Sequence, residues 1–271
     1  MAGDAKPFTT EEWWSDYESC RSDKPLFEPS RGLRSIPAVL SARPAALLRE
    51  EAGVGPGTTV ADVGAGTGIF SAMVLEIGSH VIGVEPNQRM REAAQEHIGP
   101  HSRYRSVAGA AEATGLAEAS VDLITAAQAF HWFPVEETSR EFRRILRPGG
   151  RVALLWNTRR VTESPFLEGY ESILEEWGTD YTMVRRSYDV EDSLAHLFDG
   201  AEISHRNFPN EHLLGYEALE GRLLSSSYMP TREDPNGPAM LTALAALFGA
   251  HAIDDTVKME YDTEVYYGLL D

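Results

Sequence analysis

The chain has 271 residues, with 24 Lys and Arg against 42 Asp and Glu, so its formal net charge is −18 at pH 7. A field of this sign repels phosphate backbones and anionic lipid surfaces, because affinity for them depends largely on Lys and Arg. We therefore expect neither a nucleic-acid partner nor a membrane partner. The length suits one α/β domain that carries an additional cap.

Cysteine content and the N-terminal residues indicate the compartment. The single cysteine, Cys20, excludes an internal disulfide and fits a reducing cytoplasm. Residues 1–10 are polar, which predicts no signal peptide, and no apolar run of about 18 residues predicts a membrane span. No spacing of Cys and His resembles a metal site, so we expect no metal ion. The sequence thus predicts a cytoplasmic protein and leaves monomer and homodimer both open.

The first segment, residues 1–37, is rich in aromatic residues and proline. It contains Trp13, Trp14 and Tyr17, and near its end lie two arginines, Arg31 and Arg34. This composition is typical of short helices that fold over a ligand, so we expect an N-terminal arm that acts as a lid.

The most informative segment is TVADVGAGTG, residues 59–68. Small and β-branched residues at its start predict a strand that is buried on both faces. Three glycines follow at alternate positions, and their missing Cβ atoms permit unusual backbone angles and close approach of a ligand. An apolar helical pattern over residues 69–77 comes next, with Gly78 suited to its C-terminal cap. Strand, glycine loop and helix N-terminus together predict a nucleotide-type site.

The next strand, residues 81–84, ends in Glu85, which lies 19 positions beyond Gly66. An acidic residue about 20 positions after a glycine loop can accept hydrogen bonds from both hydroxyls of a ribose. Alternatively, Glu85 is a carboxylate that the dipole of the following helix favours. The combined motif favours the ribose interpretation. Asn87 is then expected to cap a helix that carries Met90.

Three more strands complete the first half of the chain. A strand over residues 104–108 leads into AGAAEATGL, and a strand over residues 121–125 ends in AAQAFHWF. The run SREFRRILRPGG predicts a helix with an apolar stripe of Phe142, Ile145 and Leu146, which Pro148 and the following glycines end. Residues 152–156 form the fifth predicted strand.

Helical patterns dominate the second half. They cover residues 166–177 and 219–224, while strands are expected to return at residues 201–208 and 257–267 with a helix at 239–251 between them. The chain is therefore divided into four segments: an arm at 1–37, a core at 38–157, a helical cap at 158–238 that includes a strand near 201–208, and a C-terminal helix with the last strands at 239–271 that completes the core sheet.

The glycine loop departs from the dinucleotide fingerprint, which requires Gly or Ala where this chain has Ile69. With Asp62 two residues before Gly64, the loop instead resembles that of class I S-adenosylmethionine-dependent methyltransferases. The resemblance continues in order over residues 38–157. The AFHWF segment looks most like the type 11-like small-molecule subgroup, which includes trans-aconitate methyltransferase. The resemblance implies an α/β fold, a Rossmann-like three-layer sandwich with a mixed seven-stranded sheet and helical lid insertions.

It also implies a binding site for S-adenosyl-L-methionine, which leaves as S-adenosyl-L-homocysteine. Many relatives have an acidic residue at the position of Ala110, so adenine binding is left to backbone amides and Glu112. The cofactor-binding residues that the resemblance implies are Asp62, Val63, Gly64, Ala65, Gly66, Glu85, Pro86, Met90, Ala111, Glu112 and Gln128.

The substrate pocket is expected to contain Tyr17, Gln128, His131 and Trp132. His131 follows the fourth strand beside the methyl donor, and its ordinary pKa near 6.5 suits removal of a proton from the methyl acceptor. The alternative is that His131 and Trp132 only line the pocket wall. Weaker candidates are Tyr181 and Tyr228 for acid–base or cation–π roles, and Arg31, Arg34, Arg185 and Arg186 for a substrate carboxylate or phosphate. His205 and His212 are interpreted as structural or surface residues.

The resemblance implies methyl transfer to oxygen, nitrogen or carbon of a small-molecule acceptor, with secondary metabolism as one setting. A nicotinamide-dependent oxidoreductase on the same sheet is the second hypothesis, against which Ile69 argues. A third is a non-catalytic protein that only binds the cofactor, since intact donor motifs do not require turnover.

Overall fold

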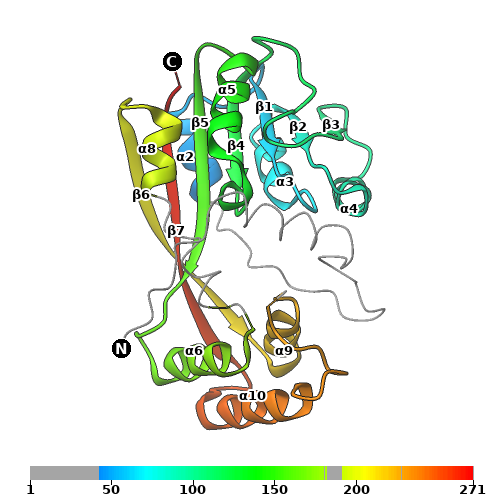
Figure 1. Ribbon diagram of the computed structural model, residues 1–271, viewed down its shortest axis with the longest axis vertical. Helices are drawn as coiled ribbons and strands as arrows, with labels where there is room; N and C mark the ends of the chain where they lie inside the picture. The colour runs from blue at the N-terminus through cyan, green and yellow to red at the C-terminus, as the bar shows by residue number, and fades with distance from the viewer. Residues whose placement is uncertain (1–42, 180, 182–190, 227, 271) are drawn as a thin grey trace, which may run out of the picture.

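The computed structural model describes residues 43–179, 181, 191–226 and 228–270 (Figure 1). The predicted arm at 1–37 lies outside the described residues, and so do Tyr17 and Cys20. The same holds for the four candidate arginines, Arg31, Arg34, Arg185 and Arg186.

One mixed sheet of seven strands organises the described chain, in the order β3-β2-β1-β4-β5-β7-β6. The strands from β3 to β5 run parallel, and β7 runs antiparallel to both of its neighbours. This confirms the predicted fold class. The strands are β1 (Thr59–Val63), β2 (His80–Val84), β3 (Tyr104–Val107), β4 (Val121–Ala127), β5 (Leu146–Arg159), β6 (Ile203–Leu214) and β7 (Val257–Leu269).

Helices cover both faces of the sheet and make the outer layers of a three-layer sandwich (Figure 1). Apolar residues of α2 and α3 pack on one face, and those of α5 and α8 pack on the other. The helices are α2 (Arg43–Glu51), α3 (Ile69–Glu76), α4 (Gln88–Ile98), the 3₁₀ turn η1 (Phe130–Trp132), α5 (Val135–Ile145), α6 (Pro165–Trp177), α8 (Glu191–Phe198), α9 (Tyr216–Leu224) and α10 (Gly237–His251). In the described part of the chain, no helix has the length and apolar character needed to cross a bilayer.

The order of the strands creates a switch point between β1 and β4. From β1 the chain moves outward to β2 and β3, and it then returns to place β4 on the other side of β1. Parallel α/β sheets bind ligands in the crevice that opens at such a point, outside the carboxyl ends of the strands. The glycine loop follows the carboxyl end of β1, so the fold places it at this crevice.

The fifth strand differs from the prediction. It begins at Leu146, which pairs with Val121, and it continues to Arg159. Leu146 therefore belongs to the sheet and not to the apolar stripe of α5, which ends at Ile145. Pro148 cannot continue the helix and disfavours helical geometry in Arg147 before it, and the register shift in the pairing with β4 accommodates the residues between Leu146 and Arg151.

The long strands β5, β6 and β7 extend past the core and carry a second hydrophobic cluster, here called the cap. It lies at the bottom of Figure 1, where α6, α9 and α10 gather around the ends of the strands. The sequence pattern grouped α10 with the core sheet, but Met240 and Leu244 of this helix are buried in the cap. A Cβ atom on Gly169 of α6 would collide with Leu247 of α10, so this glycine lets the two helices approach closely.

Candidate functional site

The three glycines after β1 have different roles. All have positive φ, at 70° for Gly64, 55° for Gly66 and 77° for Gly68. A Cβ atom on Gly64 would lie 2.5 Å from that of Ala129, and one on Gly68 would lie 3.0 Å from that of Ala94, so packing excludes larger side chains there. A Cβ atom on Gly66 would meet no atom of the described residues within 4 Å. Only Gly66 therefore opens onto space that a ligand can fill.

Glu85 joins the glycine loop to the end of β2, as the spacing predicts. Its Oε2 accepts the N–H of Gly66 at 3.0 Å, and its Oε1 accepts the N–H of Asn87 at 3.0 Å. A carboxylate can accept about four hydrogen bonds, so capacity for two more donors remains. Arg91 steadies the backbone here by donating to the carbonyl oxygen of Glu85 at 2.8 Å. The result is an oriented carboxylate beside an open glycine, which is the arrangement that a ribose diol needs.

The helix after Glu85 and the turn after β3 border the same end of the sheet. Asn87 caps α4 by accepting the N–H groups of Arg89 at 2.9 Å and Met90 at 3.3 Å, and Met90 is half-buried in the first turn. Pro86, between Glu85 and this cap, is exposed. This confirms Asn87 as the N-terminal capping residue of α4.

Ala111 and Glu112 form the tip of a tight turn. Backbone hydrogen bonds of 3.2 and 3.1 Å between Ala110 and Ala113 close it. Among the hydrogen bonds of the described residues, none uses the amide N–H of Ala111 or Glu112. The side chain of Ala111 is buried and that of Glu112 is half-buried. The tip therefore offers two backbone donors, as the departure at Ala110 requires.

Asp62 lies beneath the glycine loop and not on its open side. The residue is 1% exposed, its Oδ2 accepts the hydroxyl of Ser71 at 2.6 Å, and its Oδ1 accepts that of Thr125 at 2.9 Å. Burial raises the pKa of Asp62 to about 6, although the two hydroxyl hydrogen bonds act in the opposite direction. Asp62 thus ties β1 to α3 and β4. The structure makes it a positioning residue for the loop, with Val63 likewise buried beside it.

Replacing Asp62 by Asn should change how stability depends on pH. Because the folded-state pKa exceeds the ordinary value of 3.8, the folded wild type holds a proton that the unfolded chain has released between about pH 4 and pH 6. Wild-type stability therefore loses about 2 to 3 kcal/mol from this group as the pH rises through that window. The Asn variant lacks this ionisable group. The difference between its free energy of unfolding and that of the wild type should therefore rise by about 2 to 3 kcal/mol between pH 4 and pH 7. Urea unfolding at a series of pH values measures it, and parallel curves for the two proteins would contradict the assignment.

Gln128 occupies a strained position at the end of β4. Its φ of 58° is left-handed, which costs a non-glycine residue of order 1 kcal/mol. Two bonds to β5 hold it there: its N–H donates to the carbonyl of Leu155 at 2.8 Å, and its Nε2 donates to the carbonyl of Asn157 at 3.3 Å. Gln128 therefore bridges the carboxyl ends of β4 and β5, next to the switch point.

His131 and Trp132 follow in η1, on a turn that Phe130 anchors in the core. The rings of His131 and Trp132 pack with centroids 4.7 Å apart, and Trp132 is 37% exposed. Burial lowers the pKa of His131 to about 4, so its imidazole is neutral at neutral pH. A base is most effective when its pKa lies near the working pH, so this environment favours the wall interpretation over the general base.

The weaker candidates are in structural positions. Tyr181 is buried in the cap, where its hydroxyl donates to Glu171, and its ring packs 5.3 Å from that of Tyr228. His205 stacks on Tyr266 with centroids 4.2 Å apart, and His212 lies beside Tyr261 at 5.2 Å. Within the described residues, no three His, Cys, Asp or Glu side chains are arranged to hold a metal ion.

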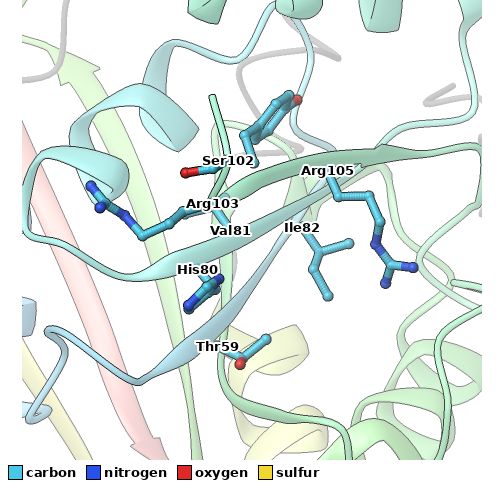
Figure 2. A pocket seen from close by; sticks show the side chains of 8 residues that line it. Thr59, His80, Val81, Ile82, Ser102, Arg103 and Arg105 are labelled. Carbon is cyan, nitrogen blue, oxygen red and sulfur yellow. The ribbon is translucent and has the colours of Figure 1, made fainter. Parts of the chain in front are cut away.

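A cavity of about 250 Å³ lies at the opposite end of the strands (Figure 2). Thr59 and His80, which line it, are the first residues of β1 and β2, so it opens at the amino ends of the strands. In Figure 2 the side chains of Arg103 and Arg105 point away from each other. This cavity is therefore separate from the candidate site at the carboxyl ends.

Comparison with known proteins agrees with this geometry. Residues 61–154 match the family model described as a methyltransferase domain. A protein of Schizosaccharomyces pombe named as an uncharacterized methyltransferase-like protein is 29% identical over 272 residues, which cover 97% of this chain and 95% of the relative. An uncharacterized methyltransferase of Mycobacterium tuberculosis is 38% identical over 100 residues, which cover 37% of this chain and 40% of the relative.

Solved structures show the same fold. A protein of Anaeromyxobacter dehalogenans named as a candidate type II methyltransferase has a TM-score of 0.60 at 23% identity, covering 84% of this chain and 96% of that chain. A candidate methyltransferase of an antibiotic biosynthesis pathway from Anabaena variabilis has a TM-score of 0.57 at 21% identity, covering 85% of this chain and 98% of that chain. The family model, the full-length relative and the fold agree, so this chain carries a methyltransferase domain over residues 61–154 and has the fold of known methyltransferases.

Proposed function

We propose that this methyltransferase takes its methyl group from S-adenosylmethionine and transfers it to a small-molecule acceptor. The observation that carries the proposal is the pair formed by Glu85 and Gly66. The carboxylate is oriented by the loop amide at 3.0 Å and retains acceptor capacity, while Gly66 leaves open space beside it. Both lie at the crevice where α/β sheets bind nucleosides.

The cofactor is bound mainly by backbone and by one charged side chain in this proposal. Glu85 accepts hydrogen bonds from the ribose hydroxyls, and the loop backbone at Gly64, Ala65 and Gly66 lies along the ribose and methionine parts. Met90 covers one face of the adenine, and the free tip amides of Ala111 and Glu112 donate to its edge. Asp62 and Val63 support the loop from below, and Pro86 borders the cleft.

Methyl transfer is an in-line displacement at a sulfonium carbon, so the acceptor atom must lie on the side of the methyl opposite the sulfur. Holding two reactants in line supplies much of the rate enhancement, and no covalent enzyme intermediate is needed. Gln128, His131 and Trp132 follow β4 at the carboxyl edge of the sheet, where they would orient the acceptor. The atom that is methylated can be oxygen, nitrogen or carbon.

A small acceptor fits the charge of the chain and the place of the cap. The formal net charge of −18 opposes a polyanionic substrate such as nucleic acid. The cap extends from the strands β5, β6 and β7, of which β5 borders the end of β4. An acceptor between core and cap would be shielded from water.

Replacement of Glu85 by Ala tests the proposal. We expect the affinity for S-adenosylhomocysteine to fall by about 1.5 to 3 kcal/mol, roughly 10- to 150-fold, because hydrogen bonds to a charged group are of this strength. Isothermal titration calorimetry on the full chain measures it. Glu92→Ala is the matched control, since it removes the same charge from the exposed surface of α4, where the carboxylate accepts the Nε2 of Gln88 at 2.8 Å.

Two outcomes would contradict the proposal. One is unchanged affinity in Glu85→Ala. The other is wild-type protein that binds NAD⁺ more tightly than S-adenosylhomocysteine in the same calorimeter, which would favour the oxidoreductase. Transfer of radiolabelled methyl from S-adenosylmethionine to an acceptor then separates an enzyme from a protein that only binds the cofactor.

A further inference from the structure

One face of the strands β5, β7 and β6 changes from apolar to polar between core and cap. Near the core, Leu155 of β5 and Val265 of β7 are buried in one hydrophobic cluster, and near the cap Met259 of β7 is buried in the other. Between them the strand pairing places Asn157 opposite Thr263, and Arg159 opposite Tyr261. Directly opposed residues of antiparallel strands share a face. We call Asn157, Arg159, Thr263 and the neighbouring Asn210 of β6 the polar row.

Asn157 of the polar row is buried and only half satisfied. The residue is 9% exposed, and its Oδ1 accepts the hydroxyl of Thr263 at 2.8 Å and the Nδ2 of Asn210 at 3.3 Å. Its own Nδ2 is buried and has no acceptor within the described structure. As Asn210 lies, exchanging the amide oxygen and nitrogen of Asn157 would bring two Nδ2 groups together, so Asn210 sets the orientation of the Asn157 amide.

The side chain of Arg159 is also only partly hydrogen-bonded within the described structure. Its Nη2 donates to the carboxylate of Glu171 and to the hydroxyl of Tyr181 at 3.1 Å, while its guanidinium lies 5.0 Å from the ring centre of Tyr170. Its Nη1 is buried without an acceptor in the described part of the molecule. A buried donor that lacks a partner costs about 1 to 3 kcal/mol. Two such donors lie two residues apart on one strand face, and a ligand that accepts hydrogen bonds would satisfy both.

The polar row begins beside Gln128, which the proposed function places next to the methyl acceptor. Gln128, at the end of β4, donates its Nε2 to the backbone carbonyl of Asn157 at 3.3 Å. The row then runs along β5 toward the cap, through Arg159 to Glu171 of α6. It thus connects the edge of the proposed cofactor site with the cap.

We propose that the polar row binds a carboxylate of the methyl acceptor, through Asn157 Nδ2 and Arg159 Nη1; this inference rests on the proposed function. A carboxylate accepts hydrogen bonds and donates none, which matches a site where only donors are unsatisfied. Arginine also strengthens the bond by its charge. A phosphate dianion fits less well, because Glu171 already balances the charge of Arg159. The acceptor class is therefore a small carboxylic acid.

The test uses the full chain saturated with S-adenosylhomocysteine. Calorimetry or ligand-observed NMR measures the binding of a panel of short mono- and dicarboxylic acids, benzoate included, and of the primary amide of each acid. We expect at least one acid to bind at least 10-fold more tightly than its amide. Asn157→Asp keeps the oxygen that accepts from Thr263 and Asn210 but presents a negative charge, so it should abolish this preference. Arg159→Gln should abolish it as well.

Arg160→Gln is the matched control. Arg160 directly follows the last residue of β5, and it pairs with Asp262 of β7 at 2.7 Å. Its replacement removes the same charge from an ion pair next to the end of this strand, and the preference for the acid should persist. A purely structural polar row would show no response of the acid-to-amide ratio to Asn157→Asp.

The outcomes separate the two proposals. If the wild type fails to bind S-adenosylhomocysteine, the proposed function and this inference both fall. If it binds S-adenosylhomocysteine but no acid binds better than its amide, or if both variants keep the preference, the carboxylate site is overturned and the proposed function stands.

Discussion

Gly66→Val should weaken binding of S-adenosylhomocysteine by more than about 100-fold while the chain still folds. The new side chain has room among the described residues, because an added Cβ atom meets none of their atoms within 4 Å, so it would occupy space that the proposed cofactor site needs. A valine at φ 55° also adds backbone strain, for which we expect a loss of about 1 to 3 kcal/mol of folding stability. Calorimetric titration gives the affinity, and urea unfolding gives the stability.

Gly149→Val separates ligand clash from strain. Gly149 also has positive φ, at 78°, and an added Cβ atom there meets nothing within 4 Å, but it lies near the start of β5, at the opposite end of the sheet. This variant should lose comparable stability and keep full affinity. If Gly66→Val binds S-adenosylhomocysteine like the wild type, the glycine loop does not contact the cofactor.

His131→Ala should lower methyl-transfer turnover by about 10- to 100-fold, whereas His131→Asn should stay within about 10-fold of wild type. Burial holds the pKa of His131 near 4, so the ring is a weak base at neutral pH and acts by orienting the acceptor. Asparagine keeps a planar polar group but cannot take up a proton near neutral pH. Loss of a general base would cost roughly 10² to 10⁴ in rate in both variants. Transfer of radiolabel to an acceptor found among the carboxylic acids measures the turnover.

The pH profile gives a second readout for the same residue. With its pKa lowered from 6.5 to about 4, His131 remains neutral down to that pH, so its contribution to kcat/KM should be constant between pH 6 and pH 8. His80→Ala removes an exposed histidine at the amino end of β2 and should leave turnover unchanged. Equal losses in His131→Asn and His131→Ala, together with a titration near pH 6.5, would restore the general base.

The arrangement of the residues in the proposed cofactor site could be predicted because the signals for it are local. The glycine loop, Glu85 and Asn87 lie on adjacent elements, and periodicity with turn chemistry placed all three. The contact between Gly66 and Glu85 followed from the parallel pairing of β1 and β2. Periodicity did not predict the different roles of the three glycines or the burial of Asp62. Both depend on neighbours that lie far along the chain.

The residues of the proposed acceptor site were harder to predict from the sequence. The stretch WNTRR, residues 156–160, carries the only local signal of the polar row, a break in the apolar pattern of β5. Its meaning depends on pairing with β7, such as the bond between Asn157 and Thr263, which are 106 residues apart. Leu146 was misassigned to a helix for a similar reason, since its pairing with Val121 is a tertiary contact.

A crystal structure of the full chain with S-adenosylhomocysteine tests the central claim most directly. The account predicts both ribose hydroxyls within hydrogen-bond distance of the Glu85 carboxylate, with the ligand in van der Waals contact with Gly66. A ligand bound elsewhere, or a ribose that does not contact Glu85, would contradict it.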